Sequence, residues 1–135
     1  MGDAFLVRMT TAGDLDTSFG TFGGGMPVTV PLPALRPNSY GNDHDGPAIV
    51  LAPDGTFYLA CATRTGAIER VAVAHLDATG KLDTAFGNAG WVIAGGAGNW
   101  AAYDAALQAD GKLLVTGRGF SETTGTDFGW LRLFL

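Results

Sequence analysis

The segment Leu15-Asp16-Thr17-Ser18-Phe19-Gly20 decides how this chain is organised, because it returns almost unchanged 67 residues later. The second copy reads Leu82-Asp83-Thr84-Ala85-Phe86-Gly87. A six-residue string that recurs with one substitution in 135 residues indicates a protein built from copies of one supersecondary unit. We expect Asp16 and Thr17 to hydrogen-bond local backbone amides while Phe19 enters the core.

A second pair of segments extends the repeat at a shorter spacing. Ala52-Pro53-Asp54-Gly55 matches Gln108-Ala109-Asp110-Gly111 at a shift of 56 residues. The two shifts differ by 11 residues, which predicts an insertion in the first copy, within the polar segment 33–45. Trp130-Leu131-Arg132-Leu133 then repeats Leu6-Val7-Arg8-Met9. The sequence therefore predicts a single repeat domain, 1–135, with units at about 3–69 and 70–126 and a partial third unit at 127–135.

Short apolar and β-branched runs between glycine-rich turns predict a chain made of strands. The Asp-Gly pairs predict tight hairpins, because glycine supplies the positive φ that such turns require. The run 101–107 has good helix propensity, but its counterpart 48–51 is strand-like, so we predict a strand there too. The expected strands are 5–10, 28–30, 48–51, 57–62, 69–77, 91–93, 103–107, 112–117 and 128–135.

Four strands in each unit at near-even spacing are typical of propeller blades. We predict an all-β fold with two four-stranded antiparallel β-propeller-type blades plus one extra strand at the N-terminus. That extra strand matches 69–77 and 128–135, which we interpret as the last strand of each unit. Two blades cannot close a ring, which needs about four to eight. The expected partners are therefore other copies of the chain, in a homo-oligomer, or further repeats of a longer propeller.

The motif residues resemble a known repeat family. An apolar strand that ends in an arginine and an apolar residue, a polar hairpin and then Leu-Asp-Thr-Ser-Phe-Gly resemble the delta-60 repeat over nearly the whole chain. The resemblance implies a β-propeller-type fold in tandem within large bacterial secreted or surface proteins, with no activity attached to the repeat. It implies an extracellular or cell-surface location, although residues 1–4 do not begin a signal peptide.

Composition excludes several classes of function. Hydrophobic residues make up 47% of the chain and charged residues 16%, which is typical of a globular protein. The net charge is −5 and the few basic residues are scattered, so we expect no nucleic-acid partner. No apolar run approaches the length of a membrane-spanning helix, so membrane insertion is not expected. Cys61 is the one cysteine and is expected to be a small buried hydrophobe.

Two groups of residues are candidate ligand sites. Asp43, His44 and Asp45 could hold Ca²⁺ or a transition metal, although we favour a solvated turn-rich loop because no distal glutamate follows at the required spacing, and no cofactor is otherwise expected. Aromatic side chains near loops of the second unit could stack on sugar rings or plug the core between blades. These aromatic residues are Trp91, Trp100 and Tyr103.

One strand position carries Arg8, His75 and Arg132 in successive copies, and we expect it to pair with an aspartate of the neighbouring turn. No serine lies in a nucleophile elbow, and the glycine runs precede strands, unlike phosphate-binding loops. We therefore predict a non-catalytic β-propeller-type scaffold or interaction module of a bacterial surface or secreted protein. The alternative is a multivalent, lectin-like carbohydrate-binding propeller assembled from several chains, and a third reading is a module stabilised by Ca²⁺.

Overall fold

The computed structural model describes residues 4–20, 28–30, 47–65, 68–95 and 98–135. These residues form nine strands in three antiparallel sheets and no helix, so the predicted all-β class is confirmed. The insertion predicted within 33–45 lies outside the described residues. The strands are β1 (Ala4–Leu6), β2 (Val28–Val30), β3 (Ala48–Leu51), β4 (Phe57–Thr65), β5 (Ile68–Leu76), β6 (Trp91–Ala94), β7 (Asn99–Leu107), β8 (Leu113–Ser121) and β9 (Gly125–Leu133).

The predicted grouping of one strand and two four-stranded blades is wrong for the described residues. They form a β1–β2 pair, a four-stranded sheet β3–β4–β5–β6 and a three-stranded sheet β7–β8–β9. After the second motif copy, Asn88 accepts and donates backbone hydrogen bonds with Trp91, and Gly90 adopts a φ of 96°. This turn brings β6 back antiparallel onto β5, with Trp91 opposite Ala74. The second motif copy therefore joins the third strand of the four-stranded sheet to the fourth strand of the same sheet.

The two motif copies share two backbone hydrogen bonds. The N–H of Asp16 donates to the carbonyl of Arg8 at 2.8 Å, and that of Asp83 donates to His75 at 2.9 Å. In both copies the phenylalanine N–H donates to the aspartate carbonyl at 3.1 Å. The aspartate Oδ1 atoms of Asp16 and Asp83 also accept an amide two residues further on, as predicted for the first copy. The repeat read from the sequence is thus a repeat of local structure.

The hairpin loops also share one geometry. In each, the residue before the loop donates its N–H to the carbonyl oxygen of the residue four positions later. The carbonyl oxygen of that same residue accepts the N–H of the glycine three positions later. Gly55 and Gly111 have φ values of 87° and 80°, which is the left-handed conformation that closes a three-residue hairpin loop. The positive φ expected at the Asp-Gly pairs is confirmed. The four loops with this pattern are 53–55, 109–111, 11–13 and 78–80.

The hairpin registers repeat as well as the loops. Tyr58 pairs with His75 between β4 and β5, and the equivalent Leu114 pairs with Arg132 between β8 and β9. The predicted strand at 101–107 is confirmed, because it lies within β7. A β-bulge at Tyr103 interrupts the β7–β8 register.

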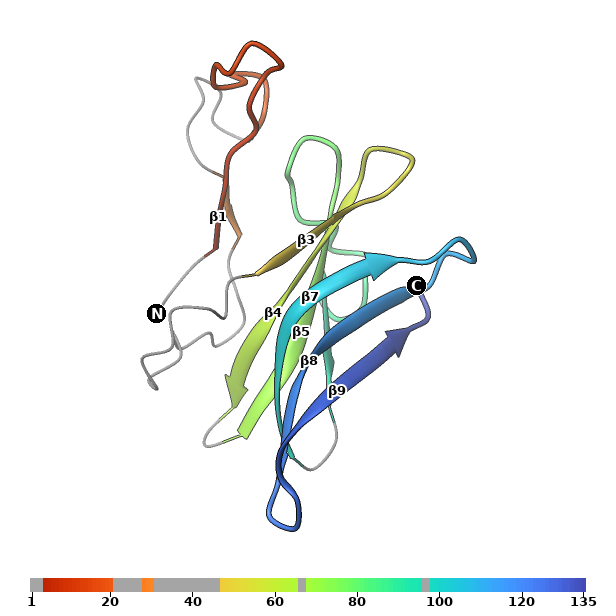
Figure 1. The fold of residues 1–135 in the computed structure, drawn as a ribbon. Coiled ribbons are helices and arrows are strands. Elements are labelled where there is room, and N and C mark those ends of the chain that lie inside the picture. The colour runs from red at the N-terminus through yellow and green to blue at the C-terminus, as the bar shows by residue number, and fades with distance from the viewer. Residues whose placement is uncertain (1–3, 21–27, 31–46, 66–67, 96–97) are drawn as a thin grey trace.

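The four-stranded sheet, which we call the middle sheet, has a buried hydrophobic cluster on each face. Figure 1 shows its strands between β1 and the β7–β8–β9 sheet. Side chains on its first face pack with Leu6 and Phe19 from the N-terminal segment, and those on its second face pack with the β7–β8–β9 sheet. Phe19 is 6% exposed, which confirms that it enters the core. The buried first-face cluster is Leu6, Phe19, Phe57, Leu59, Cys61, Ala72, Ala74, Leu76 and Trp91. The buried second-face cluster is Val50, Ala60, Val71, Val73, Ala102, Leu113 and Val115.

Candidate functional site

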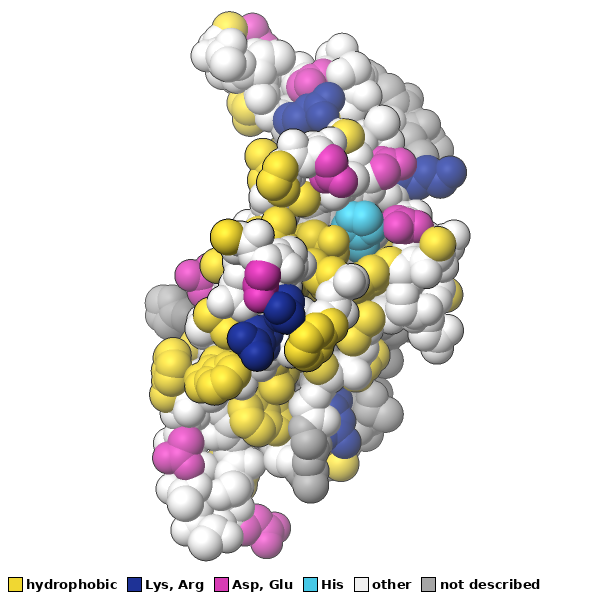
Figure 2. All heavy atoms as spheres, turned by 90° about the vertical axis from the view of Figure 1, so that its right-hand side faces the viewer, with side chains coloured by type: hydrophobic (Ala, Val, Ile, Leu, Met, Phe, Trp, Pro, Cys, Tyr) yellow, Lys and Arg dark blue, Asp and Glu magenta, His cyan; other side chains and the backbone are white. Residues whose placement is uncertain are grey.

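The three-stranded sheet β7–β8–β9, which we call the third sheet, has an apolar face exposed to solvent. Phe128 and Trp130 of β9 are 80% and 65% exposed, and Phe120 of β8 is 46% exposed. Successive strand residues point to opposite faces, so these three side chains lie on the face opposite Leu131 and Leu133, which pack into the second-face cluster. Figure 2, seen from the side on which β9 lies in Figure 1, shows hydrophobic side chains gathered there with lysine and arginine among them. We call the surface formed by Phe120, Phe128 and Trp130 the outer face.

The repeat shows what this position does in the middle sheet. The register of β8 with β9 follows that of β4 with β5, so Phe128 is equivalent to Val71 and Trp130 to Val73. Val71 and Val73 are 2% and 0% exposed because the third sheet packs against them. The same two strand positions therefore pack against a neighbouring sheet in the middle sheet and are exposed to solvent in the third sheet.

A basic residue precedes the motif at the same place in each copy, and it pairs with the motif aspartate as predicted. Arg8 Nε donates to Asp16 Oδ2 at 2.8 Å, and His75 Nδ1 lies 2.9 Å from Asp83 Oδ2. Among the described residues, the third such residue, Arg132, forms no ion pair of this kind, and its guanidinium lies 6.0 Å from the ring centroid of Phe134.

These pairs hold the carboxylates in their charged form. Hydrogen bonds from Ser18, followed by the one from Arg8, keep the pKa of Asp16 below its ordinary value. The hydrogen bond with His75 lowers the pKa of Asp83 in the same way. Arg8 and His75 occupy equivalent positions, and each pairs with the aspartate of its own motif copy. The pairing therefore has a structural role, which is to hold each motif turn against the strand before it.

His75 also lies in a small aromatic group. Its ring stacks on Tyr58 with the centroids 4.6 Å apart, and Phe86 lies 5.6 Å away at a tilt. Partial burial raises the pKa of Tyr58. Phe86 packs against the second-face cluster, so the motif phenylalanine fills the space between neighbouring sheets.

The three aromatic residues predicted to bind sugar do not form one site. Trp91 is 6% exposed and belongs to the first-face cluster, whereas Trp100 packs against the second-face cluster on the opposite side of the middle sheet. Tyr103, at the bulge, is 44% exposed. The carbohydrate hypothesis requires an exposed indole at Trp91, and this is not observed. Trp91 instead lies in the core, which was the alternative role considered for it.

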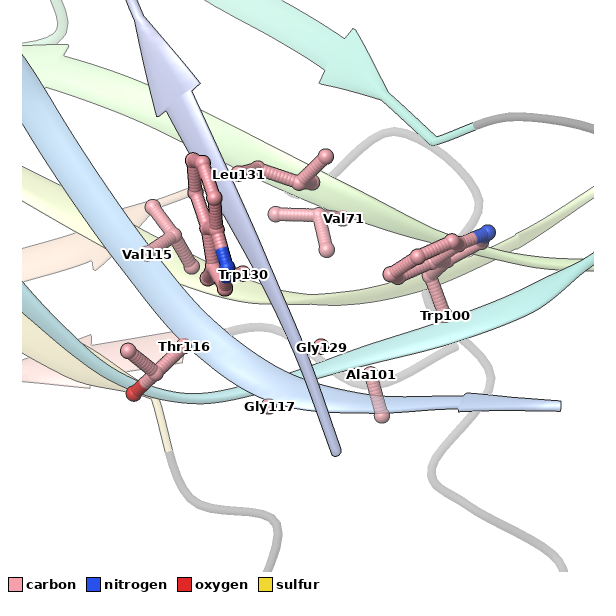
Figure 3. A pocket seen from close by; sticks show the side chains of 9 residues that line it. All are labelled: Val71, Trp100, Ala101, Val115, Thr116, Gly117, Gly129, Trp130 and Leu131. Carbon is pink, nitrogen blue, oxygen red and sulfur yellow. The ribbon is translucent and has the colours of Figure 1, made fainter. Parts of the chain in front are cut away.

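Trp100 lies against glycines of the third sheet. A Cβ added to Gly129 would stand 2.5 Å from Cζ3 of the Trp100 ring, and one added to Gly119 would stand 3.2 Å from it. Beside it is a small hollow, partly open to solvent, with a volume of about 10 Å³ (Figure 3). Ligand pockets for small molecules usually have volumes of about 300–1,000 Å³, so this hollow is too small to be a substrate site. Its lining residues are Val71, Trp100, Ala101, Val115, Thr116, Gly117, Gly129, Trp130 and Leu131.

The predicted metal ligands Asp43, His44 and Asp45 lie outside the described residues. In the part of the chain that is described, no three His, Cys, Asp or Glu side chains are grouped to hold a metal. Cys61 is 4% exposed, as predicted, and burial raises the pKa of its thiol to about 12. None of the described segments is a helix long and apolar enough to cross a membrane.

The outer face was not singled out from the sequence, although a signal for it is present. Strand β9 reads Gly-Thr-Asp-Phe-Gly-Trp-Leu-Arg-Leu, in which both alternating sets of positions contain large apolar residues. A strand with one solvated face normally alternates apolar with polar residues. Apolar residues on both sides of β9 therefore indicate a strand meant to be covered on both faces.

Comparison of the chain with protein-family models, with curated proteins and with solved structures finds no match. The resemblance to the delta-60 repeat therefore rests on the motif residues. The functional proposal below is based on the geometry of the sheets.

Proposed function

We propose that this chain is a non-catalytic, β-propeller-type interaction module that associates through the outer face of its third sheet. Its surface packs against another apolar β-sheet face, in the way that the third sheet packs against the middle one. The resemblance to the delta-60 repeat supports a role as a scaffold in a bacterial surface or secreted protein.

One observation carries this proposal. Val73 is fully buried by the next sheet, whereas its equivalent Trp130 is 65% exposed. Contiguous exposed apolar side chains on a soluble protein usually mark an interaction site. Aromatic residues dominate the energetics of such interfaces, and Phe120, Phe128 and Trp130 are all aromatic.

The test is the mass of the protein in solution, measured by light scattering over a range of concentrations. We expect the chain to self-associate, because its outer face has no cover of its own, and we expect the combined Phe128→Ser and Trp130→Ser variant to remain a monomer. The control is Tyr103→Ser, which removes an exposed aromatic outside the outer face and should leave association unchanged. A mass that stays monomeric at every concentration, or association that the double variant retains, would contradict the proposal.

The carbohydrate-binding alternative gains no support from the arrangement of Trp91, Trp100 and Tyr103. Two of these side chains lie on opposite sides of the middle sheet, and only the third is largely exposed. We therefore put forward the interaction module alone.

A further inference from the structure

Strand β9 has one free edge among the described residues. It pairs with β8 on one side, and the described chain places no strand on the other side. Its equivalents β1 and β5 each have an antiparallel partner on that second side, β2 and β6. An unpaired strand edge is a template for pairing with another polypeptide, and β9 contains no proline or lysine to prevent it.

The edge also has an unmatched charge. In the other two copies, the residue equivalent to Arg132 contacts the aspartate of the following turn, and its carbonyl accepts that aspartate's N–H. Because the β8–β9 register repeats that of β4–β5, the backbone of Arg132 faces the free edge as that of His75 faces β6. Asp110 lies near enough for the charge of Arg132 to help lower its pKa, but the hydrogen bond to this carboxylate comes from Lys112.

The partners of β1 and β5 define what would fit. Each begins with Leu-Asp-Thr, a small residue and Phe-Gly, and each ends in a short apolar strand, Val28–Val30 or Trp91–Ala94. The aspartate pairs with the basic residue, and the strand completes the sheet. Both segments of this kind in the described chain are already held in their own sheets.

We propose that the free edge of β9 binds, by strand addition, a peptide segment of the pattern Leu-Asp-x-x-Phe-Gly followed by a short apolar strand. Arg132 recognises its aspartate, and the backbone of β9 pairs with its strand. Main-chain hydrogen bonds supply affinity in this mode of binding, and side-chain contacts supply specificity. This inference concerns the backbone edge of β9 and the side chain of Arg132, whereas the proposed function concerns the side chains of Phe120, Phe128 and Trp130.

The test uses a fluorescently labelled synthetic peptide with the sequence of residues 82–94, titrated into the full chain and followed by anisotropy. We expect saturable binding that Arg132→Ala weakens about tenfold, as is usual when a hydrogen bond to a charged group is lost. A peptide in which Asp83 is replaced by asparagine should bind the wild-type chain with a similar loss, and it should lose little more on Arg132→Ala. The matched control is Arg8→Ala, at the same repeat position. It should leave the affinity for the peptide unchanged, because Arg8 is already hydrogen-bonded to Asp16 of its own copy.

Amide hydrogen exchange locates the peptide: binding at the edge slows exchange in β9 and leaves β5 and β6 unchanged. Failure to bind up to the solubility limit of the peptide, equal affinity for the Arg132→Ala variant, or protection at β5 would each overturn the inference. Repeating the titration with the combined Phe128→Ser and Trp130→Ser variant separates the two proposals. Peptide binding that survives these substitutions belongs to the edge, whatever the light-scattering result for the outer face.

Discussion

Truncation of Leu113 to alanine tests whether the middle and third sheets share one core. Leu113 of β8 is 0% exposed and lies in the second-face cluster with Val73 of β5. The substitution removes three carbon atoms, worth about 2.4 kcal/mol at about 0.8 kcal/mol each. The cavity left behind adds to this, so we expect the free energy of unfolding to fall by about 3–5 kcal/mol.

The assay is urea unfolding followed by circular dichroism, at a protein concentration where light scattering shows a single species. Thermal unfolding should show the same loss, as a decrease in Tm of about 10–18 °C for a chain of this length. Leu51→Ala is the control, because Leu51 is 72% exposed. Its free energy of unfolding should change by no more than about 0.5 kcal/mol.

A double-mutant cycle with Val73→Ala then tests the contact between the sheets. Residues that share a core usually show an interaction energy of about 0.5–3 kcal/mol, whereas independent sites give additive losses. Since Val73 and Leu113 come from different sheets of one cluster, we expect a measurable interaction energy. Additive losses, or a loss for Leu113→Ala as small as that of Leu51→Ala, would refute the packing of these two sheets.

Three further outcomes follow from the structure. Gly117→Ala should destabilise the chain by more than about 3 kcal/mol in urea unfolding, because the added Cβ would lie 1.8 Å from a carbonyl oxygen of β7. As a comparison, Gly13→Ala should cost only about 1–2 kcal/mol, because its φ is 89° but no atom lies within 4 Å of the added Cβ. With its pKa raised to about 12 by burial, Cys61 should resist a thiolate-specific reagent at about pH 8 until urea unfolds the chain. Hydrogen bonds from Thr56 and from His75 lower the pKa values of Asp54 and Asp83 respectively. Their stabilisation is therefore present above about pH 4 and is lost as the pH falls through the folded-state values; acid titration of Asp54→Asn should show a smaller loss than that of the wild type.

The local structure of this chain was predictable because local interactions encode it. The aspartate of each motif copy bonds to an amide two residues away, and each Asp-Gly hairpin needs only its own glycine in the left-handed conformation. The comparison of repeats also gave the strand at 101–107 correctly against its helix propensity. In the motif turns and the hairpin loops, the contacts that decide the conformation lie within a few residues in the sequence, whereas the strand at 101–107 is held by its pairing with β8.

Part of the candidate site was predictable for the same reason. The pairing of Arg8 with Asp16 and of His75 with Asp83 spans eight residues across one hairpin, and the repeat alignment placed both. The outer face was not predicted, since Val73 and Trp130 are both apolar strand residues and differ only in what covers them.

The sequence by itself determined the all-β class, the hairpin turns, the two repeat shifts and the approximate positions of the strands. The expected first strand at 5–10 is shorter in the structure, where it spans Ala4–Leu6. The tertiary structure alone decided that β6 is the fourth strand of the middle sheet, that Trp91 and Trp100 lie on opposite sides of it, and that the outer face of β9 is open. The physical reason is that sheet membership depends on the direction in which the chain leaves the turn after Gly87, and burial depends on which sheet then packs against it. Contacts of that kind join residues far apart in the sequence, so the pattern within a single strand cannot specify them.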